Sequence, residues 1–551
     1  MSNNSLHKIH FLAILLIFLV SIVACYGILS TDGTILYGDF TLPTSLQRFF
    51  DMHYPLWNQY GSVNSFEFIS RLPFRAIPVV LAYFLGISAD LFYKIMVLGT
   101  MILSGLSMYF SFFYLNSSSP NRKVCIGALT ASLIYMVNFK AIHTIIWPTL
   151  HFAYAIAPTA LFSFIKLTST PSLKYAFLVV LLMTLMAGSP HYLVFMTLLM
   201  ISWLIYYTIT QKFKNINLRS IKLLILSVLL FVLVNSFWIL PFIYTAISAT
   251  APSPSTILTR ETIDTLSRNS EMVNTFRLTD IWWQHSSLMP ENEVLQCIWI
   301  PASFIVPILG FSSLLVSERR YRKYSIFFCL ISVILIFLST GTNNDFPSIY
   351  SWLVLELPFG WLLRAPNKLS MILAMMYSFS CGITLISIPR INCKETVKVA
   401  TVVLTLFCIS VIPMASGYLY GCFIPVQVPQ EYYEANDFIA GMDEYKVLWL
   451  PLSYSGSVTW APGKLVGPID VRSSSMPTIA PFDLNSKNYL LYTFEVLLEN
   501  KSNNIDKLLD VLNVKYIIFH DDVSSFEKCN INGLLEIQNG IELRKKYCLL
   551  Y

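Results

Sequence analysis

The residue best placed for acid–base chemistry is an aspartate that follows the first long apolar segment. Asp39 lies in a Tyr-Gly-Asp-Phe sequence shortly after the apolar residues 9–30. A carboxylate at a membrane surface is positioned to take a proton from a hydroxyl nucleophile or to hold a metal ion. An ordinary solvated loop acid would occupy the same position. Residue type and location therefore make Asp39 a candidate general base.

The loop that holds Asp39 carries further polar residues of two kinds. Arg75 is one of its arginines, and an arginine beside a membrane can hold a lipid phosphate through two parallel hydrogen bonds. Asp51, His53 and Glu67 are candidate auxiliary groups. Neighbouring polar residues of a solvated loop look the same, so the sequence does not say which of them would assist Asp39.

A second group of cations lies in the segment Phe-Gly-Trp-Leu-Leu-Arg-Ala-Pro-Asn-Lys at 359–368. Arg364 and Lys368 fall on a side of the membrane where positive charge is otherwise scarce. A cation placed against that trend needs a partner, and a lipid-linked phosphate would serve. Pro366 would start the next helix and aim its first amides at the same anion. The alternative is a pair of side chains that meet anionic headgroups.

Membrane-spanning helices must position these residues. Of 551 residues, 55% are hydrophobic and 12% are charged, against roughly 25% charged in a soluble domain. Too little polar surface remains for a water-soluble globule. No basic stripe indicates nucleic acid. Eleven spans are predicted, near 9–30, 95–115, 124–138, 151–165, 175–187, 193–210, 223–246, 301–317, 325–340, 369–388 and 399–417, with a re-entrant or interfacial piece at Pro73–Gly86.

Charge tests the order of these spans. Segments 1–8, 116–124, 166–174, 211–222, 318–324 and 389–398 hold sixteen Lys and Arg and two acids. Segments 31–94, 139–150, 188–192, 247–300 and 341–368 hold ten Lys and Arg and thirteen acids. The positive-inside rule places the first set, with the N-terminus, in the cytoplasm and the second set outside. Ile22-Val23-Ala24-Cys25 resembles a lipoprotein cleavage box, but we interpret residues 9–30 as a retained signal anchor.

The composition changes after the last span. Residues 1–420 form the predicted transmembrane domain, with long exterior loops at 31–94 and 247–300, and residues 421–551 form a small exterior α/β domain. Its predicted elements are a helix at 431–442, a buried strand at 446–452, a helix at 505–512 and a strand at 514–520. None of the ten cysteines forms a CxxC pair; Cys529 and Cys548 could pair with each other in the exterior domain.

The order of these parts resembles the GT-C class of membrane glycosyltransferases, and within it the YfhO-like and arabinofuranosyltransferase D-like families. The similar elements are the Gly-Asp at 38–39, Trp57 with Gly61, the Pro-rich piece 73–86, Gly105-Leu106-Ser107-Met108-Tyr109, the segment 359–368 and Leu508-Leu509-Asp510-Val511-Leu512-Asn513-Val514-Lys515-Tyr516. Each motif is short, and the agreement in order carries more weight than any one match.

The resemblance implies a sugar donor on a polyprenyl phosphate and an acceptor glycan, lipid or protein outside the membrane. Asp39 would then be the general base, and Arg364, with Lys368 and Arg75, would hold the departing phosphate. The chain lacks the Trp-Trp-Asp of the oligosaccharyltransferase branch in its C-terminal domain. It also lacks paired acids after Asp39. The cofactor therefore stays unknown, with a divalent metal possible but not indicated.

Two other functions fit a multispan protein of this kind. A transporter or flippase of lipid-linked intermediates would place ionisable groups or broken helices near mid-membrane. The predicted spans are almost free of charge, with Pro241 and the Asn235-Ser236 pair as the main interruptions. A non-catalytic member could keep the fold and lose the reaction. Polar groups gathered at one face favour surface chemistry, so we expect a glycosyltransferase.

Overall fold

The chain divides by its contacts into two units. The computed structural model describes residues 3–35, 46, 78–116, 122–145, 147–211, 217–248, 258–280, 293–357, 360–388, 393–410, 423–440, 446–450, 456–461, 465–466, 478–479, 505–511, 513–519 and 548–550. One unit comprises Met1–Gly27 and Met96–Gly421, and the other Ile28–Ile95 and Cys422–Tyr551. The predicted domain boundary at 420/421 stays a prediction.

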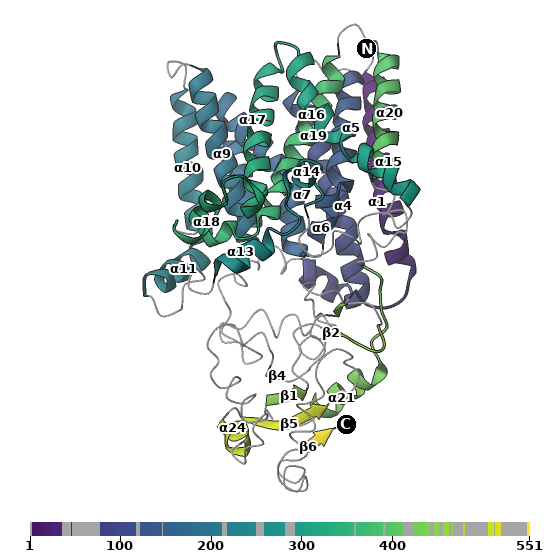
Figure 1. Ribbon diagram of the computed structural model, residues 1–551, viewed down its shortest axis with the longest axis vertical. Coiled ribbons are helices and arrows are strands. Elements are labelled where there is room, and N and C mark those ends of the chain that lie inside the picture. Colours follow the sequence, from purple (N-terminus) through teal and green to yellow (C-terminus); the bar gives the residue numbers. More distant parts are fainter. Residues whose placement is uncertain are drawn as a thin grey trace. The chain divides into compact units, whose positions relative to one another are not determined.

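The first unit is a bundle of helices (Figure 1). Its elements, with the helices α1 and α4 that continue into the second unit, are α1 (Asn3–Ser30), α4 (Ala89–Leu115), α5 (Arg122–Val137), α6 (Phe139–Ile145), α7 (Pro148–Ser169), α8 (Leu173–Met186), α9 (Pro190–Thr210), α10 (Leu218–Val234), α11 (Ser236–Ser248), α13 (Arg260–Leu266), α14 (Met272–Phe276), α15 (Glu293–Ser303), α16 (Ile305–Val316), α17 (Arg322–Ser339), η2 (Gly341–Asn343), α18 (Pro347–Leu355), η3 (Gly360–Leu363), η4 (Pro366–Lys368), α19 (Ser370–Ser387) and α20 (Cys393–Ser410).

Several of these helices are long and apolar enough to cross a bilayer, so the chain is a multi-pass membrane protein. Seven meet that test by length and composition within the described residues, or eight if a bent pair counts as one span. The predicted spans near 124–138 and 175–187 coincide with α5 and α8, and the one near 399–417 overlaps α20 over residues 399–410; these three helices are not among the seven. The count of eleven therefore stays a prediction. Residues 78–84 of the expected re-entrant piece are helical.

Helix α19 lies at the centre of the bundle because small side chains let its neighbours approach. Every residue of α19 is buried, and the helix packs against α5, α16 and α17. A Cβ on Gly382 would lie 3.0 Å from the Gly127 carbonyl oxygen of α5, which shows how near the two backbones are. Small residues at helix contacts are the usual means of association in membranes, where apolar bulk gives no extra driving force.

The Gly-x-x-Met-Tyr motif of α4 has a packing role. A Cβ on Gly105 would lie 2.7 Å from Ile17 of α1 and 2.9 Å from the Met136 sulfur of α5. The Ser132 hydroxyl donates to the Gly105 carbonyl at 2.7 Å. At the other end of the motif, the Tyr109 hydroxyl lies 2.8 Å from His10 Nδ1. The motif therefore joins α4 to two neighbouring helices.

The predicted continuous span at 223–246 is wrong in one respect, because the helix breaks at Asn235. The axes of α10 and α11 differ by 76°. The Asn235 amide donates to the Thr184 hydroxyl at 2.8 Å, and its Oδ1 accepts from the Trp238 indole at 2.9 Å. These two bonds hold the Asn235 side chain at the break, and its Nδ2 also donates to the Phe231 carbonyl at 2.9 Å, which satisfies a backbone group at the end of α10. Helix α11 turns sharply aside from α10 (Figure 1).

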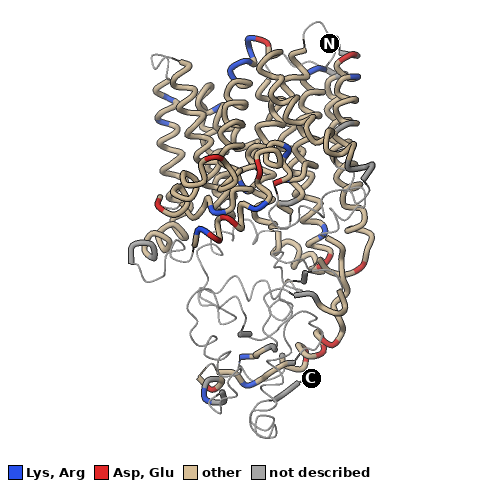
Figure 2. The backbone as a smooth tube through the Cα atoms, in the orientation of Figure 1, with Lys and Arg blue, Asp and Glu red and all other residues tan. Residues whose placement is uncertain are grey.

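The segments that connect the long helices lie at the two ends of the bundle. At one end, Tyr206 donates to the Lys323 carbonyl at 2.9 Å and Ser220 donates to the Thr168 carbonyl at 3.1 Å. At the other, which we call the loop end, lie α6, α11, α13 and α18 (Figure 1). Most charged residues of the bundle lie towards the two ends, and a few lie inside it (Figure 2). The absolute orientation in the membrane stays a prediction.

The second unit contains a parallel β-sheet. Its elements are α21 (Gln430–Ala440), β1 (Lys446–Leu450), β2 (Gly456–Ser457), β3 (Leu465–Val466), β4 (Thr478–Ile479), α24 (Ile505–Val511), β5 (Val514–Phe519) and β6 (Cys548–Leu550). Four strands form a sheet in the order β4-β1-β5-β6, in which every pairing is parallel, and β2 pairs with β3 antiparallel in a separate two-stranded sheet. Helices α21 and α24 and strands β1 and β5 match the four elements predicted for this region. The unit's place outside the membrane stays a prediction.

Candidate functional site

Five of the predicted site residues lie outside the described residues. They are Asp39, Asp51, His53, Glu67 and Arg75. Their roles stay predictions, and so does the pairing of Cys529 with Cys548, since Cys529 is also outside the described residues. Arg364 and Lys368 are described: Arg364 directly follows η3, which packs against α18 and α9, and Lys368 ends η4, which packs against α17 and α19.

Each of these two cations stacks on a tryptophan. The Arg364 guanidinium carbon lies 5.5 Å from the centre of the Trp361 ring, and the Lys368 ammonium lies 5.9 Å from the centre of the Trp147 ring. Both side chains are half-buried. Trp361 in turn meets the edge of His191 at the start of α9, with ring centres 6.1 Å apart. Stacking fixes a cation over an aromatic face while its polar head can still reach a ligand.

The loop that carries Arg364 is joined to the segment 258–280 by a glycine turn. Gly341 has φ of +60°, and a Cβ there would collide with the Ser267 hydroxyl and lie 2.7 Å from Pro366. The Ser267 hydroxyl accepts from the Thr342 amide at 3.2 Å, and the Asn343 side chain donates to the Ser267 carbonyl. Pro366 begins η4, which leads into α19 as expected. The two segments therefore dock through Ser267.

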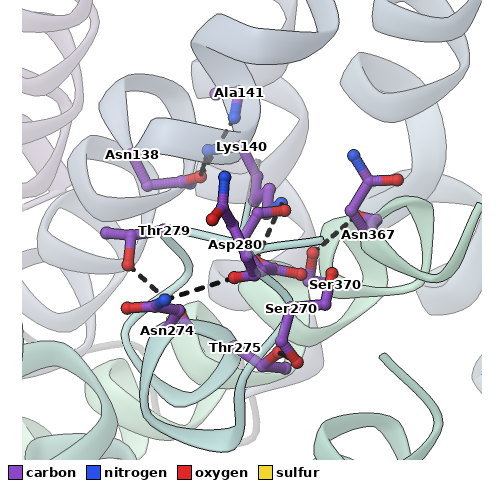
Figure 3. A network of polar contacts seen from close by, with 11 residues as sticks. Asn138, Lys140, Ala141, Ser270, Asn274, Thr275, Thr279, Asp280, Asn367 and Ser370 are labelled. Carbon is purple, nitrogen blue, oxygen red and sulfur yellow. Dashed lines mark hydrogen bonds and ion pairs between the residues drawn. The ribbon is translucent and has the colours of Figure 1, made fainter. Parts of the chain in front are cut away.

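A buried ion pair, which the sequence analysis did not select, lies inside the bundle (Figure 3). The Lys140 ammonium lies 2.8 Å from Asp280 Oδ1, and both side chains are fully buried. The same ammonium donates to the Asp280 carbonyl at 3.0 Å. Residues predicted to lie in two exterior loops are thus enclosed by the protein.

Asn138 positions Lys140. Its Oδ1 accepts from the Lys140 and Ala141 amides at 2.9 and 3.0 Å, which caps α6. Its amide group donates to the Ile134 and Tyr135 carbonyls at 2.9 and 2.7 Å, which closes the end of α5. One side chain therefore ends one helix, starts the next and orients the lysine that follows.

A left-handed residue after α14 positions Asp280. Leu278 has φ of +65°, a conformation that usually calls for glycine. The Thr279 amide donates to the Asn274 carbonyl at 2.8 Å, and the Leu278 amide donates to the Thr275 carbonyl at 3.0 Å. This is the bond pattern of a Schellman motif. A side chain in that conformation costs about 1–2 kcal/mol, which the burial of Leu278 helps to offset.

Burial and ion pairing shift the pKa of each of the two residues in opposite directions. Burial lowers the pKa of Lys140, and the nearby Asp280 carboxylate opposes that change. Burial raises the pKa of Asp280, and Lys140 opposes it. The side chains of the pair have no exposed surface. The role of the pair is to hold the segment after α14 against α6.

The sequence did contain a feature that could have selected Lys140. Lys140 is the one cation of segment 139–150, on a side depleted in positive charge. The argument that such a cation needs a partner was made for Arg364 and applies equally to Lys140. Its partner, Asp280, could not be named because residues far apart in the chain carry no mark of their contact. Among the described residues, no group of three His, Cys, Asp or Glu could hold a metal ion.

The fold resembles that of a known membrane glycosyltransferase. No protein-family model and no curated protein matches the sequence. The cryo-EM structure of arabinofuranosyltransferase AftD from Mycobacteria matches with a TM-score of 0.65 at 13% identity, over 95% of this chain and 35% of that one. Two classes of an arginine-to-serine mutant of AftD give TM-scores of 0.61 and 0.58, at 14% and 13% identity. The chain thus spans about a third of AftD's length.

Proposed function

We propose that this protein is a GT-C-type glycosyltransferase that moves a sugar from a polyprenyl-phosphate-linked donor to a glycan, lipid or protein acceptor outside the membrane. The likeness to AftD over 95% of the chain is the observation that carries the proposal. AftD is an arabinofuranosyltransferase, so a pentofuranose is the first donor sugar to test. The more specific likeness to YfhO-like proteins stays a prediction.

In this mechanism Asp39 takes the proton of the acceptor hydroxyl as that oxygen attacks the anomeric carbon. The bond from that carbon to the phosphate oxygen breaks, and the polyprenyl phosphate leaves as an anion. Arg364, stacked on Trp361, holds that phosphate, and Lys368 and Arg75 add positive charge around it. Cations that stay in place through the reaction stabilise the charge as it develops.

Replacing the proposed base tests this mechanism. Asp39→Asn should slow release of polyprenyl phosphate from labelled polyprenyl-phosphate arabinofuranose by at least about 100-fold in membranes that supply native acceptors. Asp32→Asn is the matched control, because Asp32 is an exposed acid of the same loop. Unchanged transfer by Asp39→Asn, with normal membrane insertion, would remove Asp39 from the mechanism.

A transporter of lipid-linked intermediates is the second candidate, and two observations favour it. Helix α10–α11 is broken, and Lys140 and Asp280 lie buried inside the bundle. Broken helices and intramembrane charges are typical of transport sites. Movement of a labelled polyprenyl-phosphate sugar between leaflets of proteoliposomes, with no transfer in the presence of acceptor membranes, would support transport over catalysis.

A further inference from the structure

Arg277 is a buried cation that forms no ion pair within the part of the chain that the structure describes. The residue is 8% exposed. Its Nε and Nη2 atoms are buried and have no hydrogen-bond partner. It directly follows α14, which lies farther from the loop end of the bundle than α13 does (Figure 1). The edge of the guanidinium that carries these two atoms is therefore buried in the protein.

Aromatic rings cover the faces of this guanidinium and leave its N–H edge unsatisfied. Its central carbon lies 5.2 Å from the centre of the Trp299 ring and 5.5 Å from that of Phe304. Trp299 also meets Phe139 edge to face at 5.5 Å, and Phe139 precedes Lys140. Cation–π contacts stabilise the charge, but they accept none of its hydrogens.

Arg277 has no acidic partner of its own among the residues that the structure describes. Lys140 and Asp280 pair with each other, and Arg277, three residues before Asp280, takes no part in that pair. Burial lowers the pKa of Arg277. A guanidinium nevertheless keeps its proton inside proteins, so the residue stays positively charged. A buried charge without a partner is strongly disfavoured, so a ligand or ordered water must satisfy it.

We infer that Arg277 is the binding group of an oxyanion site within the bundle, and that its ligand is a phosphate ester carried on a lipid. The adjacent Nε and Nη2 atoms form the fork that grips two oxygens of one phosphate. The aromatic walls suit the apolar part of an amphiphile. Phosphate esters are the anions that a membrane supplies to a protein embedded in it. The site is independent of sugar transfer and of Asp39.

The test uses the full chain in micelles of dodecyl maltoside, a detergent that carries no phosphate. Thermal midpoint and native mass spectrometry would be recorded with added phosphatidylglycerol, polyprenyl phosphate or inorganic phosphate. Arg277→Met removes the charge and keeps an apolar chain against the rings. Arg277→Lys keeps the charge without the fork. Arg268→Met is the matched control, because Arg268 is an exposed arginine of the same segment.

For the wild type and Arg268→Met we expect a rise in thermal midpoint with at least one lipid phosphate and little effect of inorganic phosphate. Arg277→Met should bind that lipid at least about tenfold more weakly, and Arg277→Lys should fall between. Whichever lipid acts identifies the source of the phosphate. Without added ligand, Arg277→Met should be no less stable than the wild type, because it removes an unpaired buried charge.

Three results would overturn the inference. Arg277→Met could retain the wild-type response to every lipid phosphate. It could instead be destabilised with and without ligand, which would make Arg277 a structural residue satisfied by water. The wild type could also respond to none of the three additives. Sugar-transfer activity enters none of these measurements, so failure here leaves the test of Asp39 untouched.

Discussion

The ammonium of Lys140 lies 2.8 Å from the carboxylate of Asp280, although 140 residues separate the two in the chain. The pair joins α6 to the end of α14 inside a membrane protein. A buried pair of this kind contributes little net stability compared with apolar residues of similar size. Replacing only one of the two residues is strongly destabilising, since the remaining buried charge then has no partner.

Lys140→Met should therefore destabilise the protein by about 3–5 kcal/mol, because it leaves the Asp280 carboxylate buried and unpaired. Adding Asp280→Leu should recover most of that loss. Thermal unfolding in detergent would measure both. Lys398→Met is the control, since the Lys398–Glu395 pair has a similar distance of 2.9 Å on an exposed surface and should contribute little to stability. Equal losses in single and double variants would contradict the prediction.

Gly341→Ala should loosen the junction between Arg364's loop and the segment 258–280. The position needs φ of +60°, and a methyl group there would meet Ser267 and Pro366. We expect a loss of about 1–3 kcal/mol by thermal unfolding. Gly99→Ala provides the contrast, because Gly99 lies in α4 with no atom near its would-be Cβ and alanine favours a helix. Similar stability of both variants would show that the turn tolerates a side chain.

Labelling from one side of the membrane would establish orientation. In a background without native cysteines, Arg260→Cys should react with an impermeant maleimide added outside intact cells. Arg320→Cys should react only after the cells are opened. The charge asymmetry of the connecting segments is the physical reason. The reverse pattern would put residue 39 in the cytoplasm and remove the proposed mechanism.

Arg364→Ala should weaken binding of the donor more than binding of the acceptor. Loss of a bidentate contact to phosphate should raise the KM for the donor at least about tenfold. Arg364→Lys should show a smaller effect because it keeps charge without the planar fork. Steady-state kinetics with each substrate varied in turn would separate the two. Arg322→Ala, an exposed arginine at the other end of the bundle, is the control. Equal loss for both substrates would indicate a structural arginine.

The fold class could be predicted well from the sequence. Apolar length decides which segments can span lipid, and each predicted span overlaps a described helix or pair of helices, of which seven, or eight with the bent pair, are long and apolar enough to cross a bilayer. The likeness to a GT-C enzyme agrees with the order of motifs. The bend after Val234 was harder to predict, because Asn235 and Pro241 occur in straight spans as well. The contact of Asn235 with Thr184 stabilises the break.

The sequence alone determined that this chain is a membrane protein, because the apolar length and the charge of each segment depend only on the residues of that segment. Its cations at 364 and 368 could be selected for the same reason. Only the tertiary structure decided that Lys140 meets Asp280 and that Arg277 is enclosed by aromatic rings. A pairing across 140 residues depends on how many helices pack together, and no local pattern records that outcome.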